Sequence, residues 1–349
     1  MKPCCWFQNS VSVDNEDAVK AARKQWASIS NWEETNYACS ECYMREQAGS
    51  FSPRLESLDS PAFVGAVSDD IVKLEIQIDR DCNAACLICG PWNSSTWEKY
   101  NEKVSKRINL PVHELRDTES ETQSQIKKLK KVLSLDQSKN IRFLGGEPLR
   151  NNHHVELLSE IANYENITLN YTTNGSYRPS KELLAFWKQF KRVNLTFSID
   201  GIGKHFNYLR WPLQWHQIED NIRYLVEHNQ PNIYLTKGSY TVTPFSLYYH
   251  DQYVEYHRAF VQSLSRSIEP WFDTPWEPRG ITPMSLSAVP PELAKVIGEK
   301  YGPDHSITKL LVPFDPAKHQ EFKQYIALHD FNRETDWQET FPEMIEFYK

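Results

Sequence analysis

Hydrophobic and polar residues alternate in several short segments, a pattern typical of strands with one buried face. The first segment is Lys73-Leu-Glu-Ile-Gln-Ile-Asp79, in which an apolar side chain takes every second position from Leu74 onward. Further segments alternate in the same way or are short apolar runs: Ile141–Leu144, Ile167–Thr172, Val193–Ile199, Ile233–Val242 and Ile268–Phe272. The pattern therefore predicts six strands.

Segments of helical period lie after four of these predicted strands. They are Val155–Tyr164, Lys181–Phe190, Ile218–His228 and Gln252–Leu264. Alternation of strands and helices is typical of βαβ units, in which the strands pair in parallel. Six strands are too few to close an eight-stranded barrel. We therefore predict an α/β fold built as a partial barrel or an open twisted sheet.

The regions outside this alternation of strands and helices differ from it in composition. Residues 15–33 have the period of one amphipathic helix within a polar, turn-rich start. The charged stretch 116–138 is interpreted as a solvated insertion, with an extra surface helix as the alternative. Proline-rich turns follow residue 275, and helices are predicted near 291–300 and 316–328. The resulting division has three parts: 1–69, 70–275 and 276–349.

Composition and charge exclude some classes of protein. The 349 residues carry a formal net charge of −7, which argues against binding nucleic acid through broad phosphate neutralisation. No apolar run approaches the roughly 20 residues that a membrane span requires. The start, Met1-Lys-Pro-Cys-Cys-Trp, lacks the apolar core of a signal peptide. We therefore expect a cytoplasmic protein with reduced cysteines.

All seven cysteines lie within the first 89 residues of the chain, and three of them share one loop. The loop reads Cys82-Asn-Ala-Ala-Cys86-Leu-Ile-Cys89 and follows the first predicted strand. Three thiolates on one short loop suit three corners of a cubane iron–sulfur cluster, whose fourth iron stays open to another ligand. A metal position left open is typical of a catalytic site.

Polar motifs also follow the next three predicted strands. They are Gly145-Gly146-Glu147-Pro148, Thr173-Asn174-Gly175 and Ser198-Ile-Asp200-Gly201. Each motif alone is ordinary turn chemistry. Because the carboxyl ends of parallel strands meet at one edge, we expect the three motifs and the cysteine loop to converge.

In the order and placement of these motifs, residues 70–275 resemble the radical SAM superfamily, in which Cys-x₃-Cys-x₂-Cys follows the first strand of a partial (β/α)₆ barrel. The resemblance implies that Cys82, Cys86 and Cys89 bind a [4Fe–4S] cluster and that S-adenosylmethionine (SAM) binds its open iron. It also implies a set of SAM contacts: Gly145, Gly146, Glu147, Pro148, Asn174, Ser198 and Asp200. For the last three, capping of the strand-end turns is the alternative.

Four cysteines remain outside this loop: Cys4, Cys5, Cys39 and Cys42. By themselves they would also fit a structural zinc site. Beside a radical SAM core, this segment resembles the auxiliary cluster domain of the SPASM/Twitch-type group, placed here ahead of the barrel. The resemblance implies a second, auxiliary [4Fe–4S] cluster, and zinc stays the alternative.

The same resemblance implies a reaction. The enzyme would cleave SAM reductively to methionine and a 5′-deoxyadenosyl radical, and the radical would take a hydrogen atom from a substrate. An external electron donor of the flavodoxin or ferredoxin type would be needed. We expect a peptide or protein substrate, with a small sugar or aminocyclitol-like alcohol as the runner-up. The alternative outside enzymes is a zinc-stabilised binding protein.

Other polar residues near the predicted strand ends have less specific interpretations. Adjacent residues on a helix do not face one site, so His153 and His154 are interpreted as surface or capping residues. The segment Tyr208-Leu-Arg210-Trp211 either borders a substrate cavity or forms a buried salt bridge and loop packing, and we favour the second. The same choice applies to the residues at and after the sixth predicted strand: Asp273, Trp276, Glu277 and Arg279.

Overall fold

The structure is a computed structural model. It describes residues 73–91, 93–97, 119–132, 140–228, 230–264 and 283–349, together with positions 17 and 21. Several predictions lie outside the described residues: nearly all of the helix at 15–33, the strand at 268–272, the four N-terminal cysteines Cys4, Cys5, Cys39 and Cys42, and Asp273, Trp276, Glu277 and Arg279.

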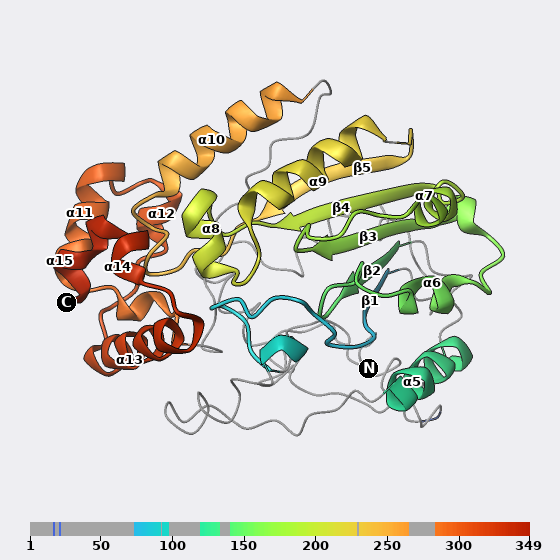
Figure 1. Cartoon of the computed structure of the whole chain (residues 1–349), viewed down its shortest axis with the longest axis horizontal. Coiled ribbons are helices and arrows are strands. Elements are labelled where there is room, and N and C mark those ends of the chain that lie inside the picture. Colours follow the sequence, from blue (N-terminus) through green and yellow to red (C-terminus); the bar gives the residue numbers. More distant parts are fainter. Residues whose placement is uncertain are drawn as a thin grey trace.

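Five strands form one parallel sheet, in which they follow one another in chain order (Figure 1). They are β1 (Lys73–Gln77), β2 (Asn140–Leu144), β3 (Thr168–Thr173), β4 (Arg192–Ser198) and β5 (Ile233–Ser239). The structure confirms the α/β class and the first five predicted strands. In Figure 1, β3 and β4 point toward the side of the molecule where the C-terminal helices gather.

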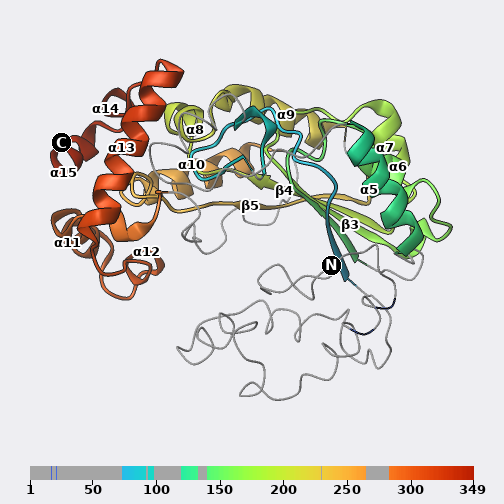
Figure 2. The ribbon, with the colours of Figure 1, turned by 90° about the horizontal axis from the view of Figure 1, so that it is seen from below.

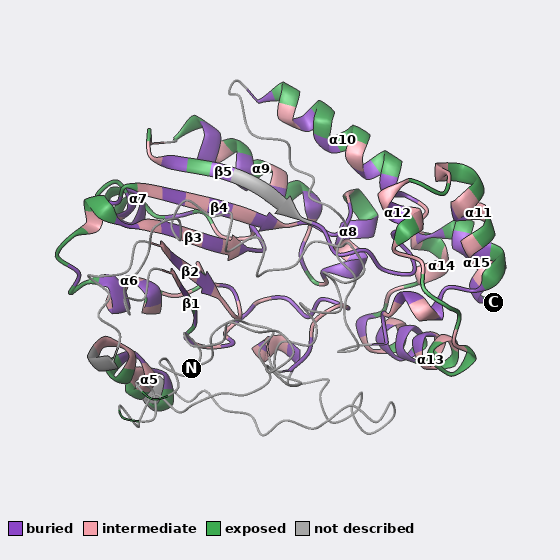
Figure 3. Cartoon of the chain, turned by 180° about the vertical axis from the view of Figure 1, so that it is seen from behind, coloured by how far each residue is buried: buried purple, intermediate pink, exposed green. Residues whose placement is uncertain are grey.

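One face of this sheet is apolar and packs against helices. Strands β2, β3 and β4 bury every second residue. The buried residues join a core with side chains of α6 (His153–Leu158), α7 (Lys181–Trp187) and α9 (Trp215–Glu227). These helices lie on one side of the sheet (Figure 2). The alternate strand residues are half-buried, and many are polar (Figure 3).

The observed helices differ from the predicted ones mainly in length. The helix predicted at 155–164 ends at Leu158, and a 3₁₀ turn, η5 (Tyr164–Asn166), follows it. The helix α8 (Gly203–Leu209) was not predicted, because seven residues are too short to show a clear period. The helix α10 (His250–Ser263) confirms the fourth predicted helix.

The interpretation of 116–138 as a solvated insertion is wrong for α5 (Glu119–Val132), which is a helix. Among its described side chains, 121–130, the buried ones are Thr122 and Ile126, which lie four residues apart on one face of the helix. Gln123 donates to Glu156 on α6 at 3.0 Å, and this contact ties α5 to the helical side of the sheet.

Helices also occupy residues 283–349, beginning with the 3₁₀ turn η6 (Leu286–Ala288). They are α11 (Pro291–Tyr301), α12 (Ser306–Lys309), α13 (Pro316–Arg333), α14 (Trp337–Thr340) and α15 (Ile345–Tyr348), with η7 (Pro342–Met344) before the last. The Asp315 carboxylate accepts from the backbone N–H groups of Ala317 and Lys318, and Pro316 sits at the first helical position, so α13 starts with a strong cap.

The buried residues form two apolar cores. The first lies between the sheet and helices α6, α7 and α9. The second gathers the C-terminal helices with α8, α10 and residues 240–249. A 3₁₀ turn, η3 (Ser95–Trp97), contributes Trp97 to the second core. Among the described residues, no helix is long and apolar enough to cross a membrane.

Candidate functional site

The cysteine loop, residues 78–91, lies between the two apolar cores. Cys82, Ala84 and Cys86 belong to the core of the sheet. Ala85 and Leu87 belong to the core of the C-terminal helices. Side chains of an extended backbone alternate in direction, so the loop is placed by burial on both of its sides.

Backbone hydrogen bonds hold the middle of this loop against the end of α8. The Ala85 N–H donates to the Trp211 carbonyl at 2.7 Å, and the Leu87 N–H donates to the Leu209 carbonyl at 2.8 Å. These bonds flank Cys86 on both sides. The segment 85–87 is therefore paired like a short strand, although it belongs to no sheet.

Helix α13 holds the same two residues through their carbonyl groups. The Tyr325 hydroxyl donates to the Leu87 carbonyl at 2.8 Å. The Arg333 guanidinium donates to the Ala85 carbonyl at 2.5 Å. Both contacts are buried, so α13 completes the hydrogen bonding of the residues next to Cys86.

Hydroxyl groups of the following turn hold the loop around its first cysteine. Thr96 donates to the Cys82 carbonyl at 2.6 Å, and the Ser95 hydroxyl accepts from the Cys82 N–H at 3.2 Å. Ser94 donates to the Ala84 carbonyl at 2.5 Å. The protein's own hydrogen bonds therefore fix the backbone of the loop.

All three cysteines of this loop are free thiols, with Cys82 and Cys86 buried and Cys89 half-buried. Burial raises the pKa of Cys82 to about 12, and the neighbouring Cys86 sulfur adds to the rise. Burial and the other two sulfurs raise the pKa of Cys89. Thiols in such an environment hold negative charge well only when a metal binds them.

Three free thiols on one loop are the donor set that a cubane iron–sulfur cluster takes, with each thiolate on its own iron. In the part of the chain that the structure describes, no three His, Cys, Asp or Glu side chains converge closely enough to hold one metal ion.

The Gly-Gly turn after β2 packs directly against the cysteine loop. Gly145 has φ +117°, which favours glycine, and a Cβ on it would lie 2.6 Å from the Asp79 carbonyl oxygen. A Cβ on Gly146 would lie 2.2 Å from the Asp81 carbonyl oxygen. The Glu147 N–H donates to that same oxygen at 2.7 Å. The turn and the loop thus approach at backbone distance.

Glu147 joins the ends of β2 and β3. Its buried carboxylate accepts from the Thr173 hydroxyl at 2.7 Å, the Asn174 N–H at 2.6 Å and the Leu149 N–H at 3.1 Å. Burial raises the pKa of this carboxyl, and these donors oppose the rise. The structure places Glu147 beside the cysteine loop, with both carboxylate oxygens engaged by the protein.

Asn174 lies over the first cysteine. Its side-chain amide donates to Asn83 at 3.0 Å and stands 3.9 Å from the Cys82 sulfur. The side-chain oxygen of Asn174 accepts from the N–H and the hydroxyl of Ser176. The predicted site residues Cys82, Glu147 and Asn174 are therefore brought together, as the convergence of strand ends required.

The two polar residues of the motif after β4, Ser198 and Asp200, differ in burial and in their contacts. Ser198 is half-buried at the end of β4, where it pairs in register with Ser239. Asp200 is completely buried, and its carboxylate binds Arg210 at 2.7 Å and accepts from the Thr241 N–H at 2.9 Å. The favoured interpretation of the segment Tyr208–Trp211 as a buried salt bridge is thereby confirmed for Arg210.

The two histidines after the Gly-Gly turn do not share a site. His153 binds the Asp79 carboxylate at 2.7 Å. His154 is buried against the rings of Phe143 and Tyr171, and burial lowers its pKa to about 4. A surface or capping role is thus wrong for His154, which is a neutral core residue.

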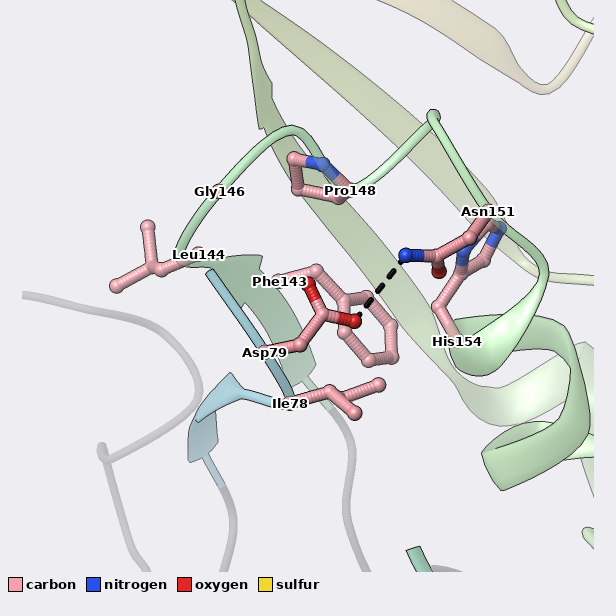
Figure 4. A pocket seen from close by; sticks show the side chains of 8 residues that line it. All are labelled: Ile78, Asp79, Phe143, Leu144, Gly146, Pro148, Asn151 and His154. Atoms are coloured by element: carbon pink, nitrogen blue, oxygen red, sulfur yellow. Dashed lines mark hydrogen bonds between the residues drawn. The ribbon is translucent and has the colours of Figure 1, made fainter. Parts of the chain in front are cut away.

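The described residues contain a small pocket beside the Gly-Gly turn (Figure 4). The Asn151 amide donates to the Asp79 carboxylate across it at 3.1 Å. Its free volume of about 10 Å³ holds no more than one water. A larger hollow of about 640 Å³ lies between α5, α6 and α7 and contains none of the predicted site residues. Gly146 and Pro148, two of the predicted SAM contacts, line the small pocket.

Sequence reasoning missed the residues that hold the cysteine loop from a distance. Tyr325 and Arg333 carry no local signal, because they lie 238 and 248 positions from their partners in the loop. Asn83 was missed although it lies inside the loop, since one asparagine in a turn is unremarkable by pattern.

Comparisons with known proteins point to one family. The model of the Radical SAM superfamily matches residues 76–247. No curated protein sequence matches the chain.

Solved structures that are similar to this chain include those of two proteins, anSMEcpe and SuiB. A structure of anSMEcpe with bound AdoMet shares 17% identity, with 70% of this chain and 61% of that chain covered, at a TM-score of 0.39. The same protein is also solved with AdoMet and the Cp18Cys peptide, at 17% identity, 70% and 63% coverage and a TM-score of 0.38. SuiB of Streptococcus suis shares 14% identity, with 92% and 58% covered, at a TM-score of 0.37. The chain thus spans about 60% of the length of these proteins.

Replacing Gly146 with alanine should destabilise the fold. The added methyl group would meet the Asp81 carbonyl, which is backbone and cannot turn away, so a loss of roughly 1–3 kcal/mol or more is expected. Chemical denaturation measures the loss. Gly298→Ala is the matched control. Gly298 lies in the interior of α11, and a Cβ on it would meet open space, so alanine there should stabilise the fold by about 0.5–1 kcal/mol. Equal stability of the two variants would contradict the close approach.

Removing the Tyr325 hydroxyl should loosen the cysteine loop. Tyr325→Phe leaves the buried Leu87 carbonyl without this donor, so it should cost about 1–2 kcal/mol of stability and reduce iron retention. The control is Tyr348→Phe, which removes a buried hydroxyl bond to the Pro244 carbonyl in the same layer of helices. Both variants should lose stability, but only Tyr325→Phe should release iron faster to a chelator. Equal release from both would show that α13 does not support the loop.

Proposed function

We propose that residues 76–247, which match the model of the Radical SAM superfamily, form a radical SAM domain, and that the protein uses it to modify a peptide or protein by hydrogen-atom abstraction. The observation that carries this proposal is the cysteine loop. It presents three free thiols at the carboxyl end of β1, with a backbone held on both sides of Cys86.

The chain's own residues would bind and orient the cofactors. Cys82, Cys86 and Cys89 would hold a [4Fe–4S] cluster, and its chemistry with SAM is reductive cleavage to methionine and a 5′-deoxyadenosyl radical. The Gly145–Pro148 turn would lie beside the methionyl group of SAM. Asn174 and Ser198, at the ends of β3 and β4, supply amide and hydroxyl groups to that same edge of the sheet. Asp200 was expected in this set as well, but its carboxylate is already engaged by Arg210 and Thr241.

A second cluster is part of the proposal. Cys4, Cys5, Cys39 and Cys42 would hold an auxiliary [4Fe–4S] cluster, as in the SPASM/Twitch-type group. Metal analysis of the reconstituted protein separates the alternatives. Two clusters give about eight irons per chain, whereas one cluster and one structural zinc give about four irons and one zinc.

The reaction would draw its electron from a flavodoxin or ferredoxin type of donor in the cytoplasm. Such a donor supplies the one electron that SAM cleavage consumes. If the auxiliary cluster takes an electron back from the substrate radical, the net reaction is an oxidation.

At the carboxyl ends of β3 and β4, the half-buried face of the sheet supports a polar substrate. The same face also carries two charged side chains, Arg142 and Arg192. Toward the carboxyl ends of β3 and β4 this face presents the hydroxyl groups of Thr172, Thr196 and Ser198. Further along the same face, the Asn194 amide donates to Asn170 at 2.9 Å. Hydroxyl and amide groups can both donate to and accept from a peptide backbone. They would also suit the alcohol groups of a sugar, which is why a small aminocyclitol-like alcohol is the runner-up substrate.

Formation of 5′-deoxyadenosine tests the proposal. The protein, reconstituted anaerobically with iron and sulfide and reduced, should convert SAM to 5′-deoxyadenosine, and Cys86→Ala should lower this activity at least a hundredfold. The fold should persist, because the backbone bonds of Ala85 and Leu87 remain. Gly298→Ala, far from the loop in sequence, is the control that should keep full activity.

The outcomes separate the classes of function. Cleavage retained by Cys86→Ala would contradict the cluster assignment. Zinc in place of iron, with no affinity for SAM, would favour the non-enzyme alternative of a zinc-stabilised binding protein. Stimulation of cleavage by short peptides encoded beside the gene, and not by aminocyclitols, would identify the substrate class.

A further inference from the structure

A buried arginine–carboxylate pair lies against the middle cysteine of the loop. The Arg210 guanidinium places one N–H group 3.7 Å from the Cys86 sulfur. Another nitrogen of the same guanidinium lies 2.7 Å from the Asp200 carboxylate. Neither the resemblance to the family nor the comparisons assign a role to Arg210, and the resemblance offered Asp200 as a contact to SAM.

The pair is isolated from water and fixed in direction. The Asp200 side chain is completely buried, and that of Arg210 is 9% exposed. Arg210 follows the last residue of α8, and its N–H donates to the Phe206 carbonyl at 2.8 Å. The Thr241 N–H also fixes the carboxylate by donating to Asp200 at 2.9 Å. One nitrogen of the guanidinium therefore contacts the sulfur, and another nitrogen contacts the carboxylate.

Such an arrangement has a direct effect on a cluster bound through that sulfur. Reduction adds negative charge to the cluster, and an N–H donor or a positive charge near its sulfurs stabilises the reduced form. A buried position strengthens this effect, because little water is present to screen it. The Asp200 carboxylate opposes the effect from a greater distance and limits its size.

We propose that the Arg210–Asp200 pair sets the reduction potential of the cluster held by Cys82, Cys86 and Cys89, with Arg210 raising the potential and Asp200 restraining the rise. This inference rests on the proposed function, since it requires that the loop bind the SAM-cleaving cluster. Arg210 is a positioning residue in this account, because it acts through the sulfur of Cys86 and not on substrate.

Two variants should shift the reduction potential of the cluster in opposite directions. Asp200→Asn removes the restraining carboxylate and keeps the guanidinium, so the potential should rise. The double variant Asp200→Asn with Arg210→Gln removes both charges and leaves a neutral amide pair, so the potential should fall below that of the unmodified protein. A purely structural role would not give shifts of opposite sign.

A matched control uses an ion pair that Asp81 of the cysteine loop makes with Arg150. Arg150 and Asp81 are 2.9 Å apart, and their side chains are 35% and 40% exposed. The double variant Asp81→Asn with Arg150→Gln also removes one charge of each sign. Because water and salt screen exposed charges, it should shift the potential less than either buried variant does.

The measurement is a redox titration of the full chain, reconstituted with iron and sulfide and followed by electron paramagnetic resonance. The signal that changes when SAM is added identifies the cluster with the open iron and separates it from any auxiliary cluster. Absence of a SAM-responsive signal in the unmodified protein would overturn the proposed function, and this inference with it.

A SAM-responsive signal with the same midpoint potential in all variants would overturn this inference alone. Shifts of the same sign in the two buried variants would also overturn it. Failure of both buried variants to load iron would assign the pair to folding, and would overturn its role in the potential.

Discussion

The structure depends on one extended loop that is buried on both sides. Cys82, Ala84 and Cys86 face the core of the sheet, while Ala85 and Leu87 face the core of the C-terminal helices. A shift of one residue along this loop would turn apolar side chains and thiols to the wrong sides, as in a strand that slips its register. The positions of the thiols are therefore determined largely by burial of their neighbours, and by the hydrogen bonds of the backbone between them.

The strands of the fold were predictable because their pattern is local. Alternating apolar residues marked five strands that the structure confirms, and the order of the strand-end motifs brought Cys82, Glu147 and Asn174 together. The short helix α8 and the helix α5 were harder to predict, since seven residues show no period and, among the described side chains of α5, the buried ones are Thr122 and Ile126. The partners of the loop on α13 were not predictable, because no local rule pairs residues more than 200 positions apart.

For the two carboxylates of the predicted SAM site, residue type alone does not distinguish a structural role from a ligand contact. Glu147 and Asp200 are both buried, and each already has protein donors. A buried carboxylate must be hydrogen-bonded or paired wherever it lies, so its presence at a strand end fits a structural role as well as a ligand contact. Their partners distinguish them. Glu147 accepts hydrogen bonds from uncharged groups, whereas Asp200 neutralises an arginine that reaches a cysteine sulfur.

The C-terminal helices support the cysteine loop. The sequence pattern assigns them to an extension beginning at residue 276. Yet Tyr325 and Arg333 supply buried donors to the two residues that flank Cys86, and Leu87 shares a core with Phe322 and Tyr325. A loop that must hold three thiols without its own regular structure needs support from outside the strands, because a parallel sheet pairs its neighbours only along their length. Helix α13 meets that need, and the geometry of the thiols therefore depends on residues from both the strand region and the C-terminal region.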